Sequence, residues 1–179
     1  VTLRGSLNDI DDAWLAVARA SMPALAATSP PRLLLLLGGP TAAAPFDDGY
    51  LATLLDHATA WRRRHDGRLW IVGSRRTPAT WAARARTVGA DLCWFHDGDG
   101  ANPYAAALAS ADRIATTPDS ANLLSEAAAT TAPVFVASPA RASGRLGRLV
   151  RSLIDDGRVR TADDHFDAFP VTPLSETAR

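Results

Sequence analysis

The chain has 179 residues and a formal net charge of zero, enough for one domain with a substantial core. A neutral chain has no general electrostatic attraction for nucleic acid, so we expect no nucleic-acid partner. Its most apolar run, Leu33 to Leu37, is far too short to span a bilayer, and we expect no signal peptide.

The first segment, residues 1–27, contains an amphipathic helical stretch. Its apolar side chains are spaced for one buried face: Trp14, Leu15, Val17, Ala18 and Met22. Ser29-Pro30-Pro31 then breaks the helix and marks a boundary. We therefore predict a linker and helix from an interdomain region over 1–31, a Rossmann-like domain over 32–160 and a tail over 161–179. Because the chain begins at Val1 without Met, we expect it to be part of a longer protein.

From Arg32 onward, short apolar runs alternate with amphipathic helical segments. The predicted strands cover 32–37, 69–72, 92–95, 113–116 and 133–136, and the predicted helices cover 47–65, 77–88, 102–112, 117–130 and 143–156. Strands this apolar are typical of a parallel sheet covered on both faces. The pattern predicts an α/β fold, a Rossmann-like doubly wound parallel sheet of five or six strands.

In such a sheet, ligands bind beyond the carboxyl ends of the strands. Gly38-Gly39-Pro40-Thr41 follows the first strand and could approach a phosphate closely, although it matches neither GxGxxG nor a P-loop; a tight turn is the alternative. Ser74, Arg75 and Arg76 follow the second strand, where an anionic ligand would lie; solvated arginines are the alternative. His96 follows the third.

The helix predicted over 117–130 follows the fourth strand. Thr117 is a plausible N-cap and Pro118 fits the first helical position. Asp119, Asn122 and Glu126 form a polar stripe beside the apolar face of Leu123, Leu124, Ala127 and Ala128. The helix start could bind a diphosphate while Glu126, roughly 10 Å further along, accepts hydrogen bonds from ribose hydroxyls. A solvated face without a role is the alternative.

Metal chemistry has little support in the sequence. Asp97-Gly98-Asp99 lacks the further ligands of a calcium loop, and the histidines at 57, 65, 96 and 165 have no metal-ligand spacing.

One face of the last helix carries Arg141, Arg145 and Arg148. This face is either solvated or a surface for an acidic ligand or partner. All 19 basic residues are arginine, which with abundant alanine indicates a G+C-rich bacterial genome. The lone Cys93 is expected to be a buried thiol in a reducing cytoplasm, and attachment to the inner membrane surface stays open.

Several segments together resemble the bacterial relatives of the mitochondrial fission family named for elongated mitochondria. These segments are LLLLLGGPT, VGSRRTP, ANPY, TTPDSANLLSEAAATTAPVFV and FPVTPLSETAR. That family is similar to GT-B glycosyltransferases, in which two Rossmann-like domains enclose a cleft. The resemblance implies that this chain is the C-terminal domain, which holds the nucleotide of a sugar donor, and that an N-terminal Rossmann-like domain lies outside it. A nucleoside diphosphate sugar is the implied ligand, without another cofactor.

The resemblance also implies roles. Glu126 corresponds to a glutamate that contacts ribose, and Gly38-Gly39 matches a glycine loop beside the diphosphate. The candidate binding residues are Gly38, Gly39, Pro40, Thr41, Ser74, Arg75, Arg76, His96, Asn102, Tyr104, Asp119, Ser120 and Glu126. No catalytic residue is assigned, because a general base would come from the other domain, so this chain alone should not turn over substrate. The chain departs from the family pattern at two places. It has Leu149-Val150 where a Phe-His pair is expected, and the turn Thr130-Thr131-Ala132 before Pro133 differs from the usual one. The alternative function is a scaffold, as for plant members implicated in recruiting a dynamin-like GTPase.

Overall fold

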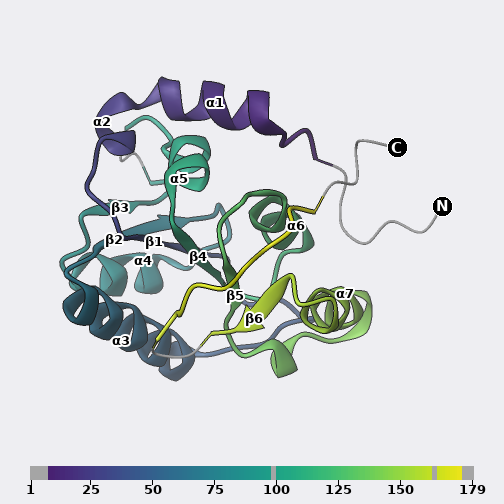
Figure 1. Ribbon diagram of the computed structural model, residues 1–179. Coiled ribbons are helices and arrows are strands. Elements are labelled where there is room, and N and C mark those ends of the chain that lie inside the picture. Colours follow the sequence, from purple (N-terminus) through teal and green to yellow (C-terminus); the bar gives the residue numbers. More distant parts are fainter. Residues whose placement is uncertain (1–7, 98–99, 163–164, 175–179) are drawn as a thin grey trace.

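The computed structural model describes residues 8–97, 100–162 and 165–174, and these build one six-stranded parallel sheet with helices on both faces (Figure 1). The strands are β1 (Arg32–Leu37), β2 (Arg68–Gly73), β3 (Leu92–Trp94), β4 (Arg113–Thr116), β5 (Val134–Val136) and β6 (Val159–Thr161). The helices are α1 (Asp12–Ser21), α2 (Pro23–Ala26), α3 (Asp48–His65), α4 (Ala79–Arg86), α5 (Tyr104–Ser110), α6 (Ala121–Ala129), the 3-10 helix η1 (Pro139–Arg141) and α7 (Gly144–Asp155). None of these helices is long and apolar enough to cross a membrane.

The strand order is β3-β2-β1-β4-β5-β6, which confirms the predicted Rossmann-like doubly wound sheet. The order reverses between β1 and β4, where Leu34 of β1 is in register with Trp70 on one side and Ile114 on the other. The five predicted strands are all present. β6 is additional, a three-residue edge strand whose Arg160 and Thr161 are exposed, so it lacks the apolar run by which the others were predicted.

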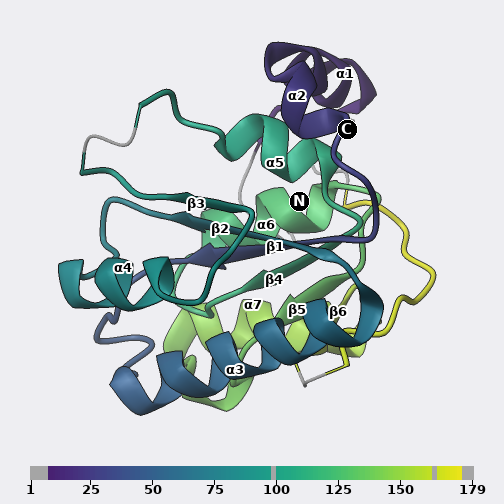
Figure 2. The same ribbon diagram turned by 90° about the vertical axis from the view of Figure 1, so that its left-hand side faces the viewer.

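The two faces of the sheet are covered by different helices. Figure 2 shows α3 and α4 on one side and α5 and α6 on the other. Alternating residues of β1 enter the two cores: Leu35 packs with the α3 and α4 side chains, while Leu34 and Leu36 pack with those of α5, α6 and α7. Period-two alternation in a strand buried on both faces explains why every residue of this run is apolar.

The segment after β6 packs on the same face of the sheet as α3. Phe166 and Phe169 are buried and meet the ring of Phe135 on β5 edge to face, with centroids 5.4 and 5.6 Å apart. Further along, the backbone N–H of Leu174 donates to the carbonyl of Ala128 in α6. The tail is therefore packed from the sheet to the last turn of α6.

α1 forms an outer layer on α5. Leu15 and Ala18 pack against Ala109, and Arg19 Nε donates to the Ala109 carbonyl at 2.6 Å. The predicted single apolar face of this helix is wrong at Val17, which is 72% exposed, because α1 contacts α5 along a narrow strip. Cys93, expected to be buried, is half-buried on β3.

Two predicted helix starts are also wrong. α4 begins at Ala79 rather than at residue 77, because the Thr77 hydroxyl donates to the Leu37 carbonyl and accepts from Ser74 N–H, joining the ends of β1 and β2. α6 begins at Ala121, and its N-cap is Ser120, whose hydroxyl accepts from Leu123 N–H, rather than Thr117.

Candidate functional site

A cavity of about 310 Å³ opens at the carboxyl ends of the strands, across the reversal between β1 and β4. Its lining comes from the ends of β1 and β2, the loop after β3, the start of α5 and one side of α6: Leu36, Leu37, Val72, Gly73, Ser74, Arg75, His96, Asn102, Tyr104, Leu123 and Glu126. The sheet end supplies an apolar floor and the surrounding loops supply polar groups, as in ligand pockets generally.

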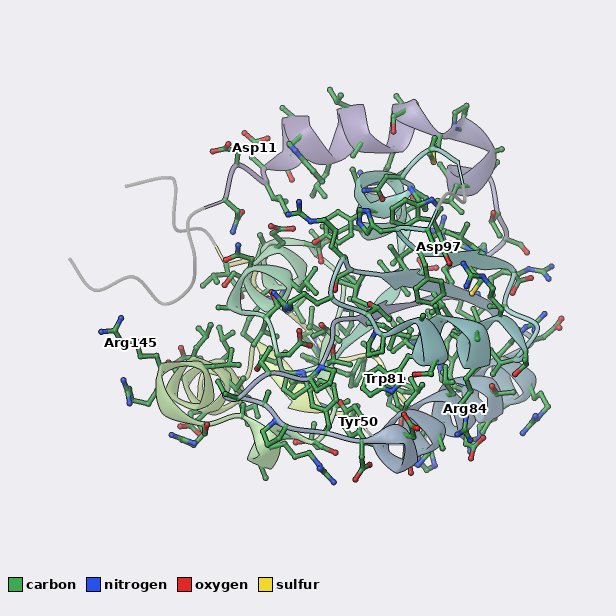
Figure 3. All side chains as sticks on the ribbon, turned by 180° about the vertical axis from the view of Figure 1, so that it is seen from behind. Asp11, Tyr50, Trp81, Arg84, Asp97 and Arg145 are labelled. Carbon is green, nitrogen blue, oxygen red and sulfur yellow. The ribbon has the colours of Figure 1, made fainter. Side chains whose placement is uncertain are left out.

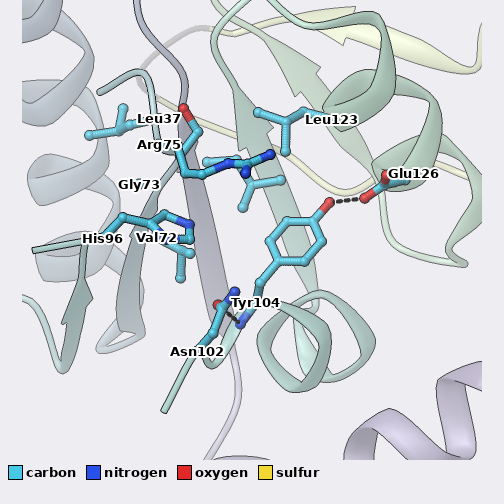
Figure 4. Close-up of a pocket in the computed structure, with 11 residues that line it drawn as sticks. Leu37, Val72, Gly73, Arg75, His96, Asn102, Tyr104, Leu123 and Glu126 are labelled. Carbon is cyan, nitrogen blue, oxygen red and sulfur yellow. Dashed lines mark hydrogen bonds between the residues drawn. The ribbon is translucent and has the colours of Figure 1, made fainter. Parts of the chain in front are cut away.

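Arg75 extends over this cavity from the loop after β2, and its guanidinium points toward Leu123 (Figure 4). The side chain is exposed and makes no hydrogen bond or ion pair with any residue that the structure describes. A guanidinium presents five N–H donors in a fork that suits phosphate and carboxylate groups. Arg75 therefore brings an unneutralised positive charge to the cavity.

Glu126 lies on the far side of the cavity, where the Tyr104 hydroxyl donates to its Oε2 (Figure 4). Tyr104 is positioned in turn by Asn102, whose Oδ1 accepts from the Tyr104 backbone N–H at 2.9 Å. Burial, the charge of Glu126 and this hydrogen bond all raise the pKa of Tyr104, so the hydroxyl remains a donor at physiological pH. The other oxygen of Glu126 has no hydrogen-bond partner among the described residues.

A second group of polar side chains lies beside the cavity and is centred on Asp119. The Asp119 side chain is fully buried, and it accepts from Arg76 Nη2 at 2.5 Å, from the Thr117 hydroxyl at 2.5 Å and from Gly39 N–H at 3.2 Å. Thr117 Oγ1 accepts in turn from Gly38 N–H at 2.8 Å. This cluster, which we call the Asp119 cluster, joins the ends of β1, β2 and β4.

The glycine pair is packed against this cluster and does not line the cavity. A Cβ on Gly38 would lie 2.1 Å from both Asp119 carboxylate oxygens, and one on Gly39 would lie 2.0 Å from the Arg76 carbonyl. The two glycines are therefore required by the close approach of an internal carboxylate and a neighbouring loop. Their N–H groups are already paired with side chains of the protein.

All 179 residues match the family model described as Mitochondrial fission ELM1. The chain belongs to this family. It is similar to the "Mitochondrial fission protein ELM1" of Arabidopsis thaliana, with 32% identity over 88 residues, which are 48% of this chain and 21% of the plant protein. The chain thus covers about a fifth of that relative's length. No solved structure matches this ELM1-family chain.

The structure brings about half of the candidate binding residues together in the cavity. Those that line it are Ser74, Arg75, His96, Asn102, Tyr104 and Glu126. Gly38, Gly39, Arg76 and Asp119 form the adjacent cluster instead, and Ser120 caps α6. Pro40 and Thr41 lie in the loop after β1, where Thr41 pairs with Ala44. The predicted polar stripe is wrong at Asp119, which precedes α6 and is buried.

The apolar residues that line the cavity are not among the candidate binding residues predicted from sequence. Val72 belongs to a buried strand, and Leu123 was assigned to the sheet-facing side of its helix. Leu123 is only half-buried, because it sits in the first turn of α6, beyond the edge of the sheet. Its position opposite Asn102 and Tyr104 follows from the β3–α5–β4 connection, which no local pattern reveals.

Metal binding has no support in the described part of this ELM1-family chain, where no group of three or more potential metal ligands occurs. Asp97 is paired with Arg86, whose Nη2 lies 2.8 Å from its Oδ1. Residues 98 and 99 of the Asp97–Asp99 segment lie outside the described residues. The cavity chemistry is therefore that of hydrogen bonding and charge: a free guanidinium, an oriented carboxylate and an imidazole.

Proposed function

We propose that this ELM1-family chain binds a nucleoside diphosphate, as the nucleotide part of a sugar donor, in the cavity at the β1/β4 reversal. The observation that carries the proposal is that Arg75 and Glu126 line the same cavity at the point where the strand order reverses. Among the described residues, Arg75 has no partner and one oxygen of the Glu126 carboxylate accepts no hydrogen bond. Doubly wound sheets bind nucleotides at this point of the fold. A cavity of about 310 Å³ falls within the range of small-molecule sites.

The two polar ends of the cavity suit the two polar parts of such a ligand. Arg75 would bind the diphosphate, because its charge is not neutralised by a protein carboxylate. Glu126 would accept hydrogen bonds from ribose hydroxyls with the oxygen that Tyr104 does not use. The apolar floor of Leu36, Val72 and Leu123 would contact the base or the sugar.

This division of roles differs from the one implied by family resemblance, in which Gly38-Gly39 holds the diphosphate. The amides of the glycine pair donate to Thr117 and Asp119, so they would serve a ligand only after those bonds break. Arg76 is likewise engaged with Asp119. We assign the diphosphate to Arg75 for this reason, with the hydroxyl of Ser74 beside it.

In a glycosyl transfer of the GT-B type, these residues would act on the leaving group. A guanidinium beside the diphosphate stabilises the negative charge that develops as the sugar departs, and this electrostatic effect needs no metal. Glu126, the carboxylate that lines the cavity, is bound by Tyr104 and is assigned to the ribose, so we give it no role as a base. We therefore propose a donor-binding role for this chain, with the base supplied by a further domain.

Isothermal titration calorimetry with uridine, guanosine and adenosine diphosphates tests the proposal. We expect saturable binding of at least one of them. Arg75→Ala and Glu126→Ala should each weaken this binding about tenfold or more, the value of one or two charged hydrogen bonds. Arg145→Ala is the matched control, since Arg145 points to solvent at the edge of the molecule (Figure 3) and removing it should leave the affinity unchanged.

The opposite result would identify the chain as a scaffold. If no nucleoside diphosphate or nucleotide sugar gives a binding heat, and a protein partner is instead retained by the immobilised chain, the donor-site proposal is wrong. Equal loss of affinity in the Arg145 variant would also contradict it, because the binding would then be non-specific attraction of an anion to arginine.

A further inference from the structure

A second cavity, of about 290 Å³, lies at the same end of the sheet but on its other face. The first cavity is walled by α5 and α6, whereas this one is walled by the amino-terminal half of α3 and by the segment after β5. Its lining residues are Asp47, Gly49, Tyr50, Thr53, Leu54, His57, Ala137, Ser138, Arg141 and Ala162. None of these was a candidate for the nucleotide site.

Two nitrogen-rich side chains, Arg141 and His57, line this cavity. Arg141 uses one N–H group, donated by Nη1 to the Pro45 carbonyl at 3.3 Å, while its guanidinium lies over the ring of Tyr50. The remaining N–H groups of Arg141 and both nitrogens of His57 have no hydrogen-bond partner among the described residues. Among the described residues, the cavity therefore has N–H donors without a protein acceptor.

Three carboxylates of the described residues, Asp47, Asp48 and Asp119, each accept a hydrogen bond from a group other than Arg141 or His57. Asp47 lines the cavity, but its Oδ1 caps α3 by accepting from Tyr50 N–H at 3.0 Å. Asp48 Oδ1 accepts from the Trp81 indole at 2.7 Å, and Asp119 is paired with Arg76. Neither Arg141 nor His57 has an ion pair with any of these three carboxylates.

The backbone after β5 has an unusual shape that directs Arg141 to this place. Ser138 has φ +43° and ψ +59°, a left-handed conformation that costs a non-glycine residue on the order of 1 kcal/mol. The turn leads directly into η1, whose last residue is Arg141. Ser138 itself is exposed and its hydroxyl is free of partners in the described chain.

We propose that this second cavity binds a small carboxylate or phosphate anion, held by the Arg141 guanidinium together with the His57 imidazole and the Ser138 hydroxyl. The Arg141 fork would take two oxygens of the anion, and His57 would donate to it from α3. The site is independent of the nucleotide proposal, because it shares no residue with the first cavity.

The imidazole resonances of the protein provide a direct test. We would record ¹H–¹³C spectra during titration with sodium phosphate or sodium malonate at constant pH, against sodium chloride of equal ionic strength, and assign the His57 signal from its loss in His57→Gln. We expect a saturable shift of His57 with at least one anion, and the tighter of the two identifies the ligand class. His96, in the first cavity, should move much less.

Variants of the arginines decide whether the shift reports this site. Arg141→Ala should weaken the response of His57 about tenfold or more, and Arg141→Lys, which keeps the charge but loses the fork, should weaken it less. Arg145→Ala removes the same charge from α7, and we expect it to leave the response of His57 to the anion unchanged. Absence of a His57 shift beyond that in sodium chloride, or an undiminished shift in a folded Arg141→Ala, would overturn the proposal. A nucleoside diphosphate that moved His57 but not His96 would refute the first site and leave the second.

Discussion

The Asp119 carboxylate is the residue on which the strand-end loops depend, because its three partners come from the loops after β1 and β2 and from the end of β4. A fully buried carboxylate is stable only when its lone pairs are satisfied and its charge is paired. Arg76, Thr117 and Gly39 fulfil both conditions. The position of the loop after β1 is therefore set by an internal anion.

Gly38→Ala should destabilise the protein. The added methyl group would lie 2.1 Å from both oxygens of Asp119, so the loop or the carboxylate must move, at a cost of about 1–3 kcal/mol. Urea unfolding would measure the change. Gly49→Ala is the control, since its Cβ would lie 3.4 Å from the nearest atom, and we expect a change below about 1 kcal/mol. Equal effects of the two substitutions would show that the close packing at Gly38 is unimportant.

Asp112 should make stability depend on pH in the acid range. Burial tends to raise the pKa of this carboxyl group, but hydrogen bonds from the Arg32 guanidinium and backbone N–H, with the charges of Arg32 and Arg113, outweigh it and lower the pKa. The folded protein thus favours the ionised form, and the stabilisation is complete above the unfolded pKa of about 4. It is lost as the pH falls through the lower pKa of the folded state.

We therefore expect Asp112→Asn to lower the free energy of unfolding at pH 7 by about 1 kcal/mol, a value for a partly exposed pair. The difference between the wild type and this variant should shrink as the pH falls below about 4. Urea unfolding at pH 7, 4.5 and 3 measures it. Asp56→Asn, an exposed carboxylate on α3 without a described partner, is the control. If the difference in unfolding free energy between the wild type and Asp112→Asn grew as the pH fell, Asp112 would not have the lowered pKa described above.

Single residues were the least predictable part of the molecule from sequence. The sequence of Gly38 and Gly39 suggests a close approach to phosphate or a tight turn, whereas the approaching groups in the structure are Asp119, about 80 positions away, for Gly38 and the Arg76 carbonyl for Gly39. Arg75 and Arg76 could not be distinguished from each other. They differ because only Arg76 lies within reach of that buried carboxylate, and this depends on the packing of three loops.

At the scale of helices and strands, apolar runs identified the strands correctly, whereas capping residues misplaced the starts of helices. β1, β4 and β5 are buried on both faces, so their composition identifies them whatever their neighbours. The start of α6 was misplaced because Thr117, Asp119 and Ser120 are all suitable caps. Thr117 and Asp119 are taken by tertiary hydrogen bonds, which leaves Ser120 for the helix.

The tail after β6 should contribute as much to stability as a covering helix. Phe166 is fully buried and packs edge to face on Phe135, so Phe166→Ala should lower the free energy of unfolding by about 3–5 kcal/mol. Thr172→Ala, at an exposed position of the same tail, should change it by less than about 0.5 kcal/mol. Chemical denaturation compares the two. A small effect of Phe166→Ala would mean that the tail is not part of the core.

The carboxyl end of α6 is closed by another buried side chain. Arg158 Nε donates to the Ala128 carbonyl and its Nη2 to the Thr130 carbonyl, both at 2.8 Å. Burial lowers the pKa of Arg158 to about 10, so the guanidinium is still charged at neutral pH. Positive charge at this end of a helix is favourable. The helix that carries Glu126 is thus held at its first turn by Ser120 and at its last by Arg158.

For the whole molecule, the two apolar cores lie on opposite faces of one continuous sheet and share its strands. Neither core can be exposed without disrupting β1, which pairs with both β2 and β4. We therefore expect a single cooperative thermal transition, with a calorimetric enthalpy close to the van't Hoff enthalpy. Differential scanning calorimetry tests this. Two resolved transitions would show that the halves of the sheet unfold separately.

The bond between Leu174 and α6 matters for anyone who wishes to dissect this domain. A chain cut after Pro170 would keep every residue that lines the cavity at the β1/β4 reversal. It would, however, remove the N–H group that Leu174 donates to the last turn of the Glu126 helix. Shortened versions intended for ligand studies should therefore extend past Leu174, and affinity tags should be attached beyond it.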